Sequence, residues 1–220
     1  MKTSYGHFCL AARSLETVGD RWSLLIIRDL LSGPRRFSDL RRLLTNVTAK
    51  LLTIRLRQLE ADGIVTRNQM AGRREVWYEL TEKGRDLAPV VEALLAWGLK
   101  HERHALAADE AAHPEHLMAG LTVALNDSAP QTARSRAWRF EFGDAEGAFD
   151  VAFDGKRWSL DGADRAPDVV VSTTPRAWAE FVTRPPARRQ LPSRAIRLSG
   201  AKDRVAELVE TLGAAPADRP

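Results

Sequence analysis

The chain has 220 residues, of which 44% are hydrophobic and 28% are charged, a composition typical of a folded globular protein. A length prior of roughly 150 residues per domain favours two modest domains over a single one. The apolar runs are shorter than the roughly 20 residues of a membrane helix, and the first residues lead into no signal-peptide segment. We therefore expect a cytoplasmic protein with no membrane partner. Its single cysteine excludes an intrachain disulfide and a cysteine-rich zinc site.

Charge is distributed unevenly along the chain. Overall, 33 Lys and Arg outnumber 29 Asp and Glu, which gives a net charge of +4. Residues 1–104 contain 18 basic and 12 acidic residues, a net charge of +6, whereas residues 105–220 contain 15 and 17, a net charge of −2. The basic excess belongs to the N-terminal half, so we expect that half to contact a polyanion.

The first half shows the pattern of helices joined by short turns. Apolar residues at helical spacing predict one helix over residues 16–31, which a Ser-Gly-Pro sequence ends. Ser38 is placed to cap a short helix that continues to about residue 44, and Thr48 to cap a longer one that ends near residue 62. Two helices joined by so short a turn form a helix-turn-helix.

Short extended segments follow the second helix of this pair. Residues 64–67 and 75–80 predict a β-hairpin, and Thr81 is expected to cap a last helix whose apolar stripe continues to Trp97. A helix-turn-helix followed by a hairpin and a flanking helix is a winged helix. Residues 101–116 have no sustained apolar face, so we place a domain boundary near residue 110.

Beyond that boundary the hydrophobic period becomes two, which is typical of half-buried antiparallel strands. We expect strands at 138–142, 149–153, 157–160, 168–172 and 196–198, a helix over 175–183, a turn at Ser199-Gly200, and a final helix that ends near residue 212. The predicted fold class is α+β. A winged helix-turn-helix domain (1–110) is followed by an α+β domain with an antiparallel sheet (111–220).

The helix that Thr48 begins has two different sides. At about 100° per residue, one arc of the helix holds Leu52, Leu56, Leu59 and Ala49. Lys50, Thr53 and Arg57 fall opposite, with Ile54 at the edge. Lys or Arg can donate to guanine, and Thr or Ile can meet a thymine methyl, in the major groove of DNA. The alternative is an ordinary solvated face. Basic residues also occur before and on the preceding helix and at the wing tip. The candidate DNA contacts are Arg35, Arg36, Ser38, Arg41, Thr48, Lys50, Thr53, Ile54, Arg57, Arg73 and Arg74.

Many short motifs in this half also carry a family resemblance. They include Gly19-Asp20-Arg21-Trp22, Gly33-Pro34-Arg35-Arg36-Phe37-Ser38-Asp39-Leu40 and Tyr78-Glu79-Leu80-Thr81-Glu82-Lys83-Gly84. In order and spacing they resemble the HxlR-type branch of the MarR-like bacterial transcription regulators, over about residues 7–104. The resemblance implies a homodimer built from the first and last helices, in which each protomer occupies one half-site of a near-palindromic double-stranded DNA operator. Position 20 departs mildly, since many members read Gly-Gly-Lys-Trp.

Cys9 falls where some members of this family carry a redox-sensing thiol. A sensing thiol needs a lowered pKa and access to oxidant, and Arg13, one helical turn further on, could favour a thiolate. Against this, a lone cysteine among apolar neighbours is more often a small buried residue.

Aromatic residues on the predicted strands and helix of the second half have two interpretations. They could enclose a cavity for a flat or greasy ligand, lined by Trp138, Phe140, Phe149, Trp158, Trp178 and Phe181. Alternatively they fill the core of a small domain, which needs large side chains to bury enough area. Two motifs, each followed by a helix, are Pro167-Asp168-Val169-Val170-Val171 and Ile196-Arg197-Leu198-Ser199-Gly200. Over about residues 115–212 this pattern resembles a sterol-carrier-protein type of domain, and the resemblance favours a small apolar ligand.

Other chemistry finds little support in the sequence. His101 and His104 lie at helical spacing and could bind a metal, but imidazoles on an exposed helix usually face water. We find no paired acid and base, glycine-rich phosphate loop or nucleophile elbow, so we expect no enzyme, no metal and no cofactor. The leading hypothesis is a dimeric regulator that represses by occluding a promoter. Its second domain senses a small apolar ligand or assists dimerisation. The alternative is a lipid-binding or carrier protein whose winged helix mediates protein contacts only.

Overall fold

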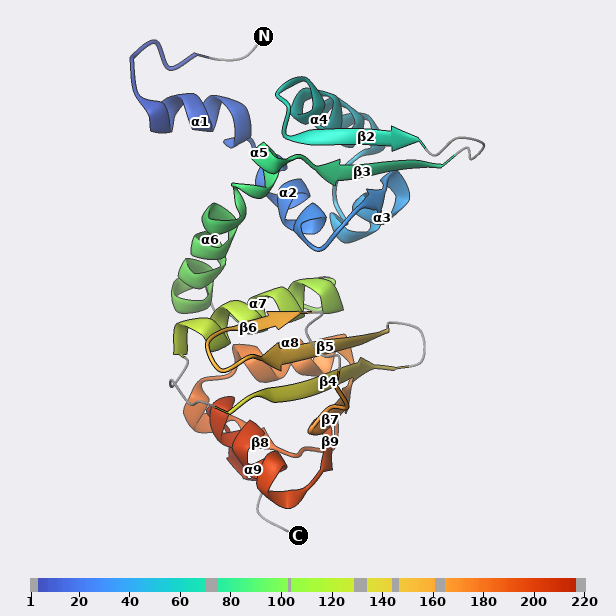
Figure 1. Ribbon diagram of the computed structural model, residues 1–220, viewed down its shortest axis with the longest axis vertical. Helices are drawn as coiled ribbons and strands as arrows, with labels where there is room; N and C mark the ends of the chain where they lie inside the picture. Colours follow the sequence, from blue (N-terminus) through green and yellow to red (C-terminus); the bar gives the residue numbers. More distant parts are fainter. Residues whose placement is uncertain are drawn as a thin grey trace. The chain divides into compact units, whose positions relative to one another are not determined.

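A computed structural model describes residues 4–69, 75–102, 104–128, 134–143, 147–160 and 165–216 (Figure 1). The chain divides into two compact units, residues 1–93 and 94–220. Helix α6 (Ala88–His101) begins in the first unit and ends in the second, and the boundary predicted near residue 110 lies beyond it. Within the described ranges, none of the helices has the length and apolar character needed to cross a membrane.

The N-terminal unit is a winged helix. Its helices are α1 (Leu10–Val18), α2 (Ser23–Leu31), α3 (Phe37–Leu43), α4 (Ala49–Ala61), α5 (Glu82–Arg85) and the start of α6. Strands β1 (Arg35–Arg36), β2 (Val65–Gln69) and β3 (Val76–Leu80) form an antiparallel sheet in the order β1-β3-β2. The predicted helix-turn-helix and hairpin are confirmed, and β1 is an addition that the sequence pattern did not predict.

Two of the predicted helices are interrupted. The helix expected over 16–31 breaks between α1 and α2, where the Asp20 carboxylate accepts from the backbone N–H of Trp22 at 2.9 Å and of Ser23 at 3.2 Å. Gly19 is required at this break, because a Cβ there would lie 2.5 Å from the Leu15 carbonyl oxygen. The helix expected after Thr81 is divided into α5 and α6, and Pro89, at the second position of α6, has no N–H with which to join the two hydrogen-bond ladders.

The core of the N-terminal unit lies among α2, α3 and α4. Its largest fully buried side chains come from those helices and from the residue that precedes β2, namely Ile26, Ile27, Leu40, Leu52, Leu56, Leu59 and Ile64. Of the four leucines of α4, Leu52, Leu56 and Leu59 are at most 1% exposed, and Leu51 is partly exposed. The inner arc predicted for this helix is therefore confirmed for Leu52, Leu56 and Leu59, whereas Ala49, at the first turn, is exposed.

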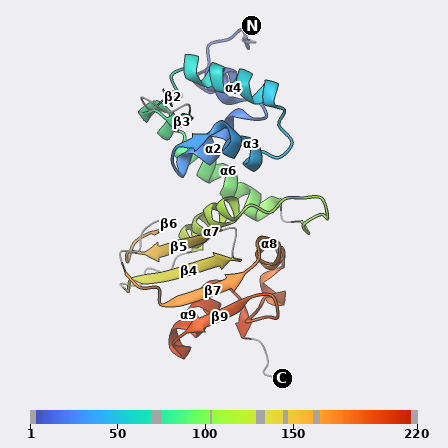
Figure 2. The ribbon, with the colours of Figure 1, turned by 90° about the vertical axis from the view of Figure 1, so that its right-hand side faces the viewer.

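The C-terminal unit is a layer of helices on a five-stranded sheet (Figure 2). Its helices are α7 (Pro114–Ser128), α8 (Pro175–Thr183), the 3-10 helix η1 (Pro186–Arg188) and α9 (Lys202–Thr211). The main sheet has the order β6-β5-β4-β7-β9, with β4 (Arg136–Phe142), β5 (Ala148–Phe153), β6 (Trp158–Leu160), β7 (Val169–Thr173) and β9 (Arg197–Gly200). Strands β8 (Gln190–Leu191) and β10 (Ala215–Pro216) form a separate parallel pair.

Three features of this unit differ from the expectations, although the pairs β4-β5, β5-β6 and β7-β9 are antiparallel as predicted. The sheet is mixed and not antiparallel, because β7 joins the free edge of β4 in the same direction, with Phe140 opposite Val171. The turn expected at Ser199-Gly200 lies within β9, which pairs with β7. Helix α7 was not predicted at all, although Met118, Leu121 and Leu125 bury one helical face there.

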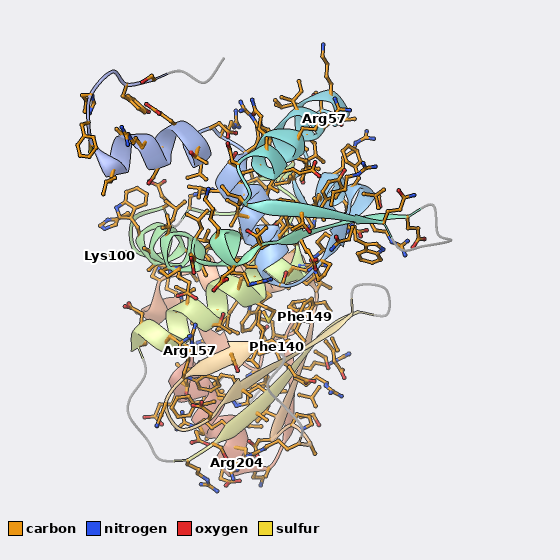
Figure 3. The ribbon with its side chains drawn as sticks, turned by 45° about the horizontal axis from the view of Figure 1, so that its top comes forward. Arg57, Lys100, Phe140, Phe149, Arg157 and Arg204 are labelled. Atoms are coloured by element: carbon orange, nitrogen blue, oxygen red, sulfur yellow. The ribbon has the colours of Figure 1, made fainter. Side chains whose placement is uncertain are left out.

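The aromatic residues of the C-terminal unit are packed against one another. Trp138, Phe140, Trp158, Trp178 and Phe181 belong to one buried cluster, and Phe149 packs on its edge. The ring centroids of Trp138 and Trp158 are 4.4 Å apart, and those of Phe140 and Trp178 are 5.0 Å apart. Figure 3 labels Phe140 and Phe149, which lie opposite each other on β4 and β5. These contacts favour the packed-core interpretation, and the ligand cavity stays a prediction.

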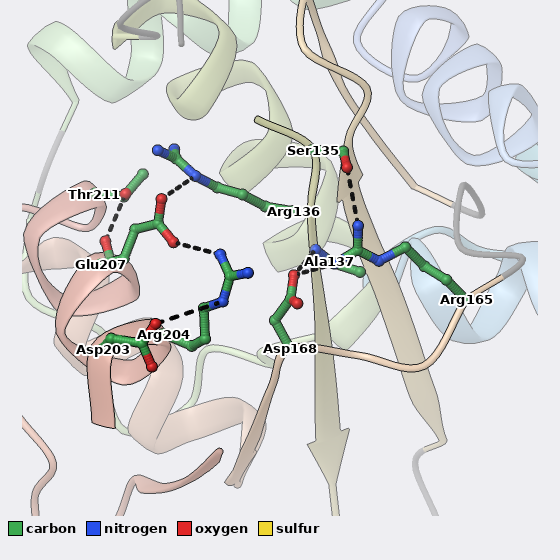
Figure 4. A network of polar contacts seen from close by, with 9 residues as sticks. All are labelled: Ser135, Arg136, Ala137, Arg165, Asp168, Asp203, Arg204, Glu207 and Thr211. Carbon is green, nitrogen blue, oxygen red and sulfur yellow. Dashed lines mark hydrogen bonds and ion pairs between the residues drawn. The ribbon is translucent and has the colours of Figure 1, made fainter. Parts of the chain in front are cut away.

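A polar network ties α9 to the start of β4 (Figure 4). Arg136 on β4 is 7% exposed, and its Nε donates to Glu207 Oε1 of α9 at 2.7 Å. Arg204 donates to the other carboxylate oxygen of Glu207 at 3.3 Å. Beside them, Asp168 accepts from the Ala137 N–H at 2.9 Å and from Arg165 at 2.6 Å. Glu207 therefore joins two guanidinium groups from different elements.

We predict that Glu207→Ala destabilises the folded chain by about 3 kcal/mol, because it removes the carboxylate that holds the mostly buried Arg136. Urea unfolding at neutral pH measures the change. Glu210→Ala is the matched control, since Glu210 lies exposed on the same helix, and it should change stability by less than about 0.5 kcal/mol. Equal effects of the two substitutions would contradict the role assigned to the network.

Candidate nucleic-acid interface

Helix α4 presents a polar face on the side opposite its buried leucines. Thr48 caps the helix, and its Oγ1 accepts from the Leu51 N–H at 3.2 Å, as the sequence predicts. Lys50 and Arg57 are exposed, and Ile54 is 43% exposed. Figure 3 labels Arg57 on this helix. A helix with such a face fits the width of a DNA major groove.

Thr53 lies on the same face but is only partly exposed. Its hydroxyl donates to the Ala49 carbonyl oxygen one turn back, at 2.8 Å. Because this bond occupies the hydroxyl proton, Thr53 is left with its methyl group and the lone pairs of its oxygen to contact a base. Thr53 is therefore suited to an apolar contact and not to donating a hydrogen bond.

The start of α3 differs from the sequence prediction. The helix begins at Phe37, so Ser38 is a residue of the first turn and not its cap. The Asp39 carboxylate instead accepts from the Arg36 N–H at 3.1 Å. Ser38 and Arg41 are exposed. They therefore remain candidates for contacts with phosphate.

Arg35 and Arg36 are not loop residues, because they form β1 and pair with Tyr78 and Trp77 of β3. The Arg36 guanidinium lies 4.7 Å from the centre of the Trp77 ring and 2.7 Å from the Glu75 carboxylate. Arg35 donates to the Ser32 hydroxyl at 3.0 Å. Arg36 therefore links the helix-turn-helix to the hairpin, and much of its charge is neutralised there.

The hairpin carries exposed polar residues toward its tip. Arg73 and Arg74, the predicted wing-tip cations, lie outside the described residues. Arg67 on β2 is exposed and was not singled out from the sequence. The sequence carried no signal for it, since strict alternation would place Arg67 on the same face as the buried Val65, and β2 is exposed at each residue from Arg67 to Gln69. Arg67 adds a cation to the side of the wing.

The junction between α1 and α2 also contacts α4. Asp20 Oδ1 lies 3.1 Å from Arg55 Nε, and Arg55 Nη1 donates to Gln58 Oε1 at 2.7 Å. The side chains of Asp20 and Arg55 are 20% and 29% exposed. Asp20 thus caps the start of α2 and positions the helix that carries the candidate contacts. Asp20, at which this chain departs from the common family pattern, therefore contacts Arg55 of α4.

Cys9 lies partly buried at the start of α1, and its carbonyl oxygen accepts from the Arg13 N–H at 3.0 Å. The Arg13 guanidinium lies over the Phe8 ring, 4.9 Å from its centre. Arg13 is therefore engaged by an aromatic ring. The redox role of Cys9 stays a prediction.

His101 and His104 belong to no cluster of metal ligands in the described ranges. Among the residues that the structure describes, no group of three or more His, Cys, Asp or Glu could hold a metal ion. His104 instead contacts Glu110 at 3.4 Å, and this hydrogen bond, with one to the Glu102 carbonyl, raises the pKa of His104.

A helix-turn-helix, a hairpin and an exposed face with Lys and Arg define the class of winged helix DNA-binding proteins. A family model described as HxlR-like helix-turn-helix matches residues 17–105. The uncharacterized HTH-type transcriptional regulator YtcD of Bacillus subtilis is 44% identical over 91 residues, 40% of this chain and 71% of YtcD. The chain belongs to the HxlR family, whose members are transcriptional regulators and not enzymes.

Further relatives cover the same region. YkvN of Bacillus subtilis is 37% identical over 107 residues, which are 46% of this chain and 89% of YkvN. A solved structure of the redox regulator HypR in its oxidized form is 36% identical, with a TM-score of 0.41 over 42% of this chain and 97% of that one. The family match ends at residue 105, so the sterol-carrier resemblance of residues 115–212 stays a prediction.

We predict that Asp20 and Arg55 are energetically coupled. In a double-mutant cycle of Asp20→Ala and Arg55→Ala, the two changes together should destabilise the chain less than the sum of the single changes, by about 1 kcal/mol for a pair this exposed. Urea unfolding of the four proteins gives the coupling. Arg55→Ala combined with Glu60→Ala, an exposed residue of α4, is the control and should be additive. If the changes in unfolding free energy for Asp20→Ala and Arg55→Ala simply add, Asp20 does not position α4 through Arg55.

Proposed function

We propose that this protein is a dimeric repressor that binds a near-palindromic operator through α4 and acts in the cytoplasm. The observation that carries the proposal is the exposed face of α4, where Lys50 and Arg57 lie opposite leucines that are at most 1% exposed. Membership of the HxlR family of transcriptional regulators supports the same conclusion.

In this proposal, some residues of the interface contact bases and others contact phosphates. Lys50 and Arg57 donate to guanine O6 and N7 in the major groove, while Thr53 and Ile54 contact thymine methyl groups. Phosphate contacts fix the register of the protein on the duplex without reading its sequence. The residues proposed for them are Arg35, Ser38, Arg41, Thr48, Arg67, Arg73 and Arg74, with Arg36 holding the base of the wing.

Dimerisation is supported by apolar side chains that the fold of one chain leaves in solvent. On and before α1, Phe8 is 80%, Leu10 70% and Leu15 52% exposed. On α6, Leu94 is 52% and Trp97 53% exposed. Soluble proteins cover such large apolar side chains when they associate. A dimer places one α4 on each half-site, and its occupation of a promoter excludes the transcription machinery.

We predict that the full chain protects a near-palindromic sequence upstream of its own coding region and that its affinity falls linearly with salt on logarithmic axes. Arg57→Ala should reduce discrimination between this operator and unrelated DNA by about 1–3 kcal/mol. Footprinting and fluorescence anisotropy measure both effects, and sedimentation of the free protein measures the dimer.

The control for Arg57→Ala is Arg157→Ala, which removes an exposed arginine of the C-terminal unit. It should leave discrimination unchanged. The repressor proposal fails if the protein protects no sequence. It also fails if the Arg57→Ala and Arg157→Ala variants discriminate equally between the operator and unrelated DNA.

A ligand-binding role of the C-terminal unit is supported by one buried polar atom. Trp178 on α8 is 0% exposed, and its indole N–H has no hydrogen-bond acceptor in the described part of the chain. An unmade hydrogen bond at a buried donor costs about 1–3 kcal/mol. A ligand with an apolar body and one carbonyl, carboxylate or hydroxyl oxygen would complete this bond. Such a ligand alters DNA binding only if it prefers one of two conformations.

We predict that Trp178→Phe weakens binding of a fluorescent fatty acid or steroid by about tenfold, the loss of one hydrogen bond. Fluorescence titration measures the affinity. Trp22→Phe, in the N-terminal unit, is the matched control and should leave the affinity unchanged. A ligand that binds without altering operator affinity would favour the carrier alternative, and the failure of every ligand to bind would favour a packed core.

A further inference from the structure

The C-terminal half contains a basic segment that its net charge of −2, from 15 basic and 17 acidic residues, conceals. Residues 181–202 include five arginines and one lysine and no Asp or Glu. They comprise the end of α8, the connection to β9 and β9 itself. Neither the helix-turn-helix nor the aromatic core accounts for this concentration of charge.

Four of the five arginines have no partner for their charge within the described ranges. Arg184, Arg188, Arg194 and Arg197 are exposed. Across those ranges, none of their guanidinium groups makes a hydrogen bond, an ion pair or a ring contact. On neighbouring elements, Glu180 pairs with Arg176 at 3.1 Å, and Glu141 accepts from Ser172 at 3.3 Å. On α9, Glu207 holds Arg136 and Arg204, while Asp203 and Glu210 are exposed to solvent. The positive charge of this segment is therefore available to an external partner.

The fifth arginine holds the segment in place. Arg189 donates to the carbonyl oxygens of Val182 at 2.7 Å, Arg184 at 3.0 Å and Leu212 at 3.2 Å. It thereby fastens the connection to the ends of α8 and α9. An arginine with this structural role presents its neighbours on an ordered backbone.

Two apolar residues anchor the rest of the connection. Leu191 is 0% and Ile196 2% exposed, and the Thr173 hydroxyl at the end of β7 donates to the Ala195 carbonyl oxygen at 3.0 Å. The connection therefore lies at the end of the sheet where β7 ends (Figure 2). Ordering such a segment before binding lowers the entropic cost of forming its contacts.

We propose that Arg184, Arg188, Arg194 and Arg197 form a second DNA-contact surface, which binds phosphates of the duplex that flanks the operator. A single small anion would need convergent, buried donors, whereas these four cations are exposed and distributed over successive elements. Duplex DNA presents about one negative charge per 1.7 Å of axis and suits such an array. The contact reads no bases, and it rests on the proposed function, since it requires an operator-bound protein.

The test compares the full chain with a variant that carries Arg184→Ala, Arg188→Ala, Arg194→Ala and Arg197→Ala. Each is titrated with a minimal operator duplex and with one that is extended on both sides, over a series of salt concentrations. On the extended duplex, the slope of log affinity against log salt should be about 4 smaller in magnitude for the variant, because each phosphate that a cation neutralises adds about 0.9 to it. On the minimal duplex, the two proteins should bind alike.

Two further variants control for charge and for folding. The four Arg→Lys changes keep the charge and should restore the slope. Lys156→Ala with Arg157→Ala removes exposed cations from another part of the unit and should leave the slope unchanged. Because the four arginines are exposed, the thermal unfolding midpoint of the alanine variant should match that of the parent.

The outcomes separate this inference from the proposed function. If the parent binds no operator at all, the proposed function fails. If the parent binds the operator but the alanine variant keeps the same slope on the extended duplex, only the second surface is overturned. If the alanine variant loses the same affinity on both duplexes, a contact with flanking DNA is also overturned. If the parent binds an acidic protein and shows no gain in affinity from the flanking DNA, the surface belongs to that partner.

Discussion

Burial of the leucine stripe on α4 is the constraint on which the DNA-binding face depends. Leu52, Leu56 and Leu59 are at most 1% exposed, and truncating a buried leucine costs about 2–5 kcal/mol. An exposed ion pair contributes about 1 kcal/mol or less. Packing therefore sets the rotation of the helix about its axis, and the polar contacts refine it. Once these leucines point inward, the 3.6-residue period leaves Lys50 and Arg57 in solvent.

The arginines of this chain divide into those that hold the fold and those that remain available to a partner. Arg36 stacks on Trp77 beside Glu75, Arg55 lies beside Asp20, and Arg136 is held by Glu207. Arg57 is exposed on α4, in contrast. A count of charges treats all of these residues alike. An arginine can contact a phosphate when the fold places no carboxylate or aromatic ring against its guanidinium group.

Local sequence signals predicted several elements closely. The helix expected over 175–183 is α8 (Pro175–Thr183), because Pro175 at its start and the apolar residues along it are both local features. Thr48 caps α4 and Gly63 follows its end with a φ of 68°, for the same reason. The break between α1 and α2 was not predicted, since apolar spacing continues through it while Gly19 and Asp20 end one helix and begin the next. Helix α7 was missed because a search for a period of two does not register Met118, Leu121 and Leu125.

The sequence by itself determined the winged helix, its outward face and its family, because caps, helical period and motif spacing act over short stretches of chain. Only the tertiary structure decided that β4 and β7 are parallel, that Arg136 meets a carboxylate 71 residues away, and that the indole N–H of Trp178 is buried without an acceptor in the described residues. Each of these depends on which distant segments come to lie side by side. That choice is made by the burial of the whole core and not by any local signal.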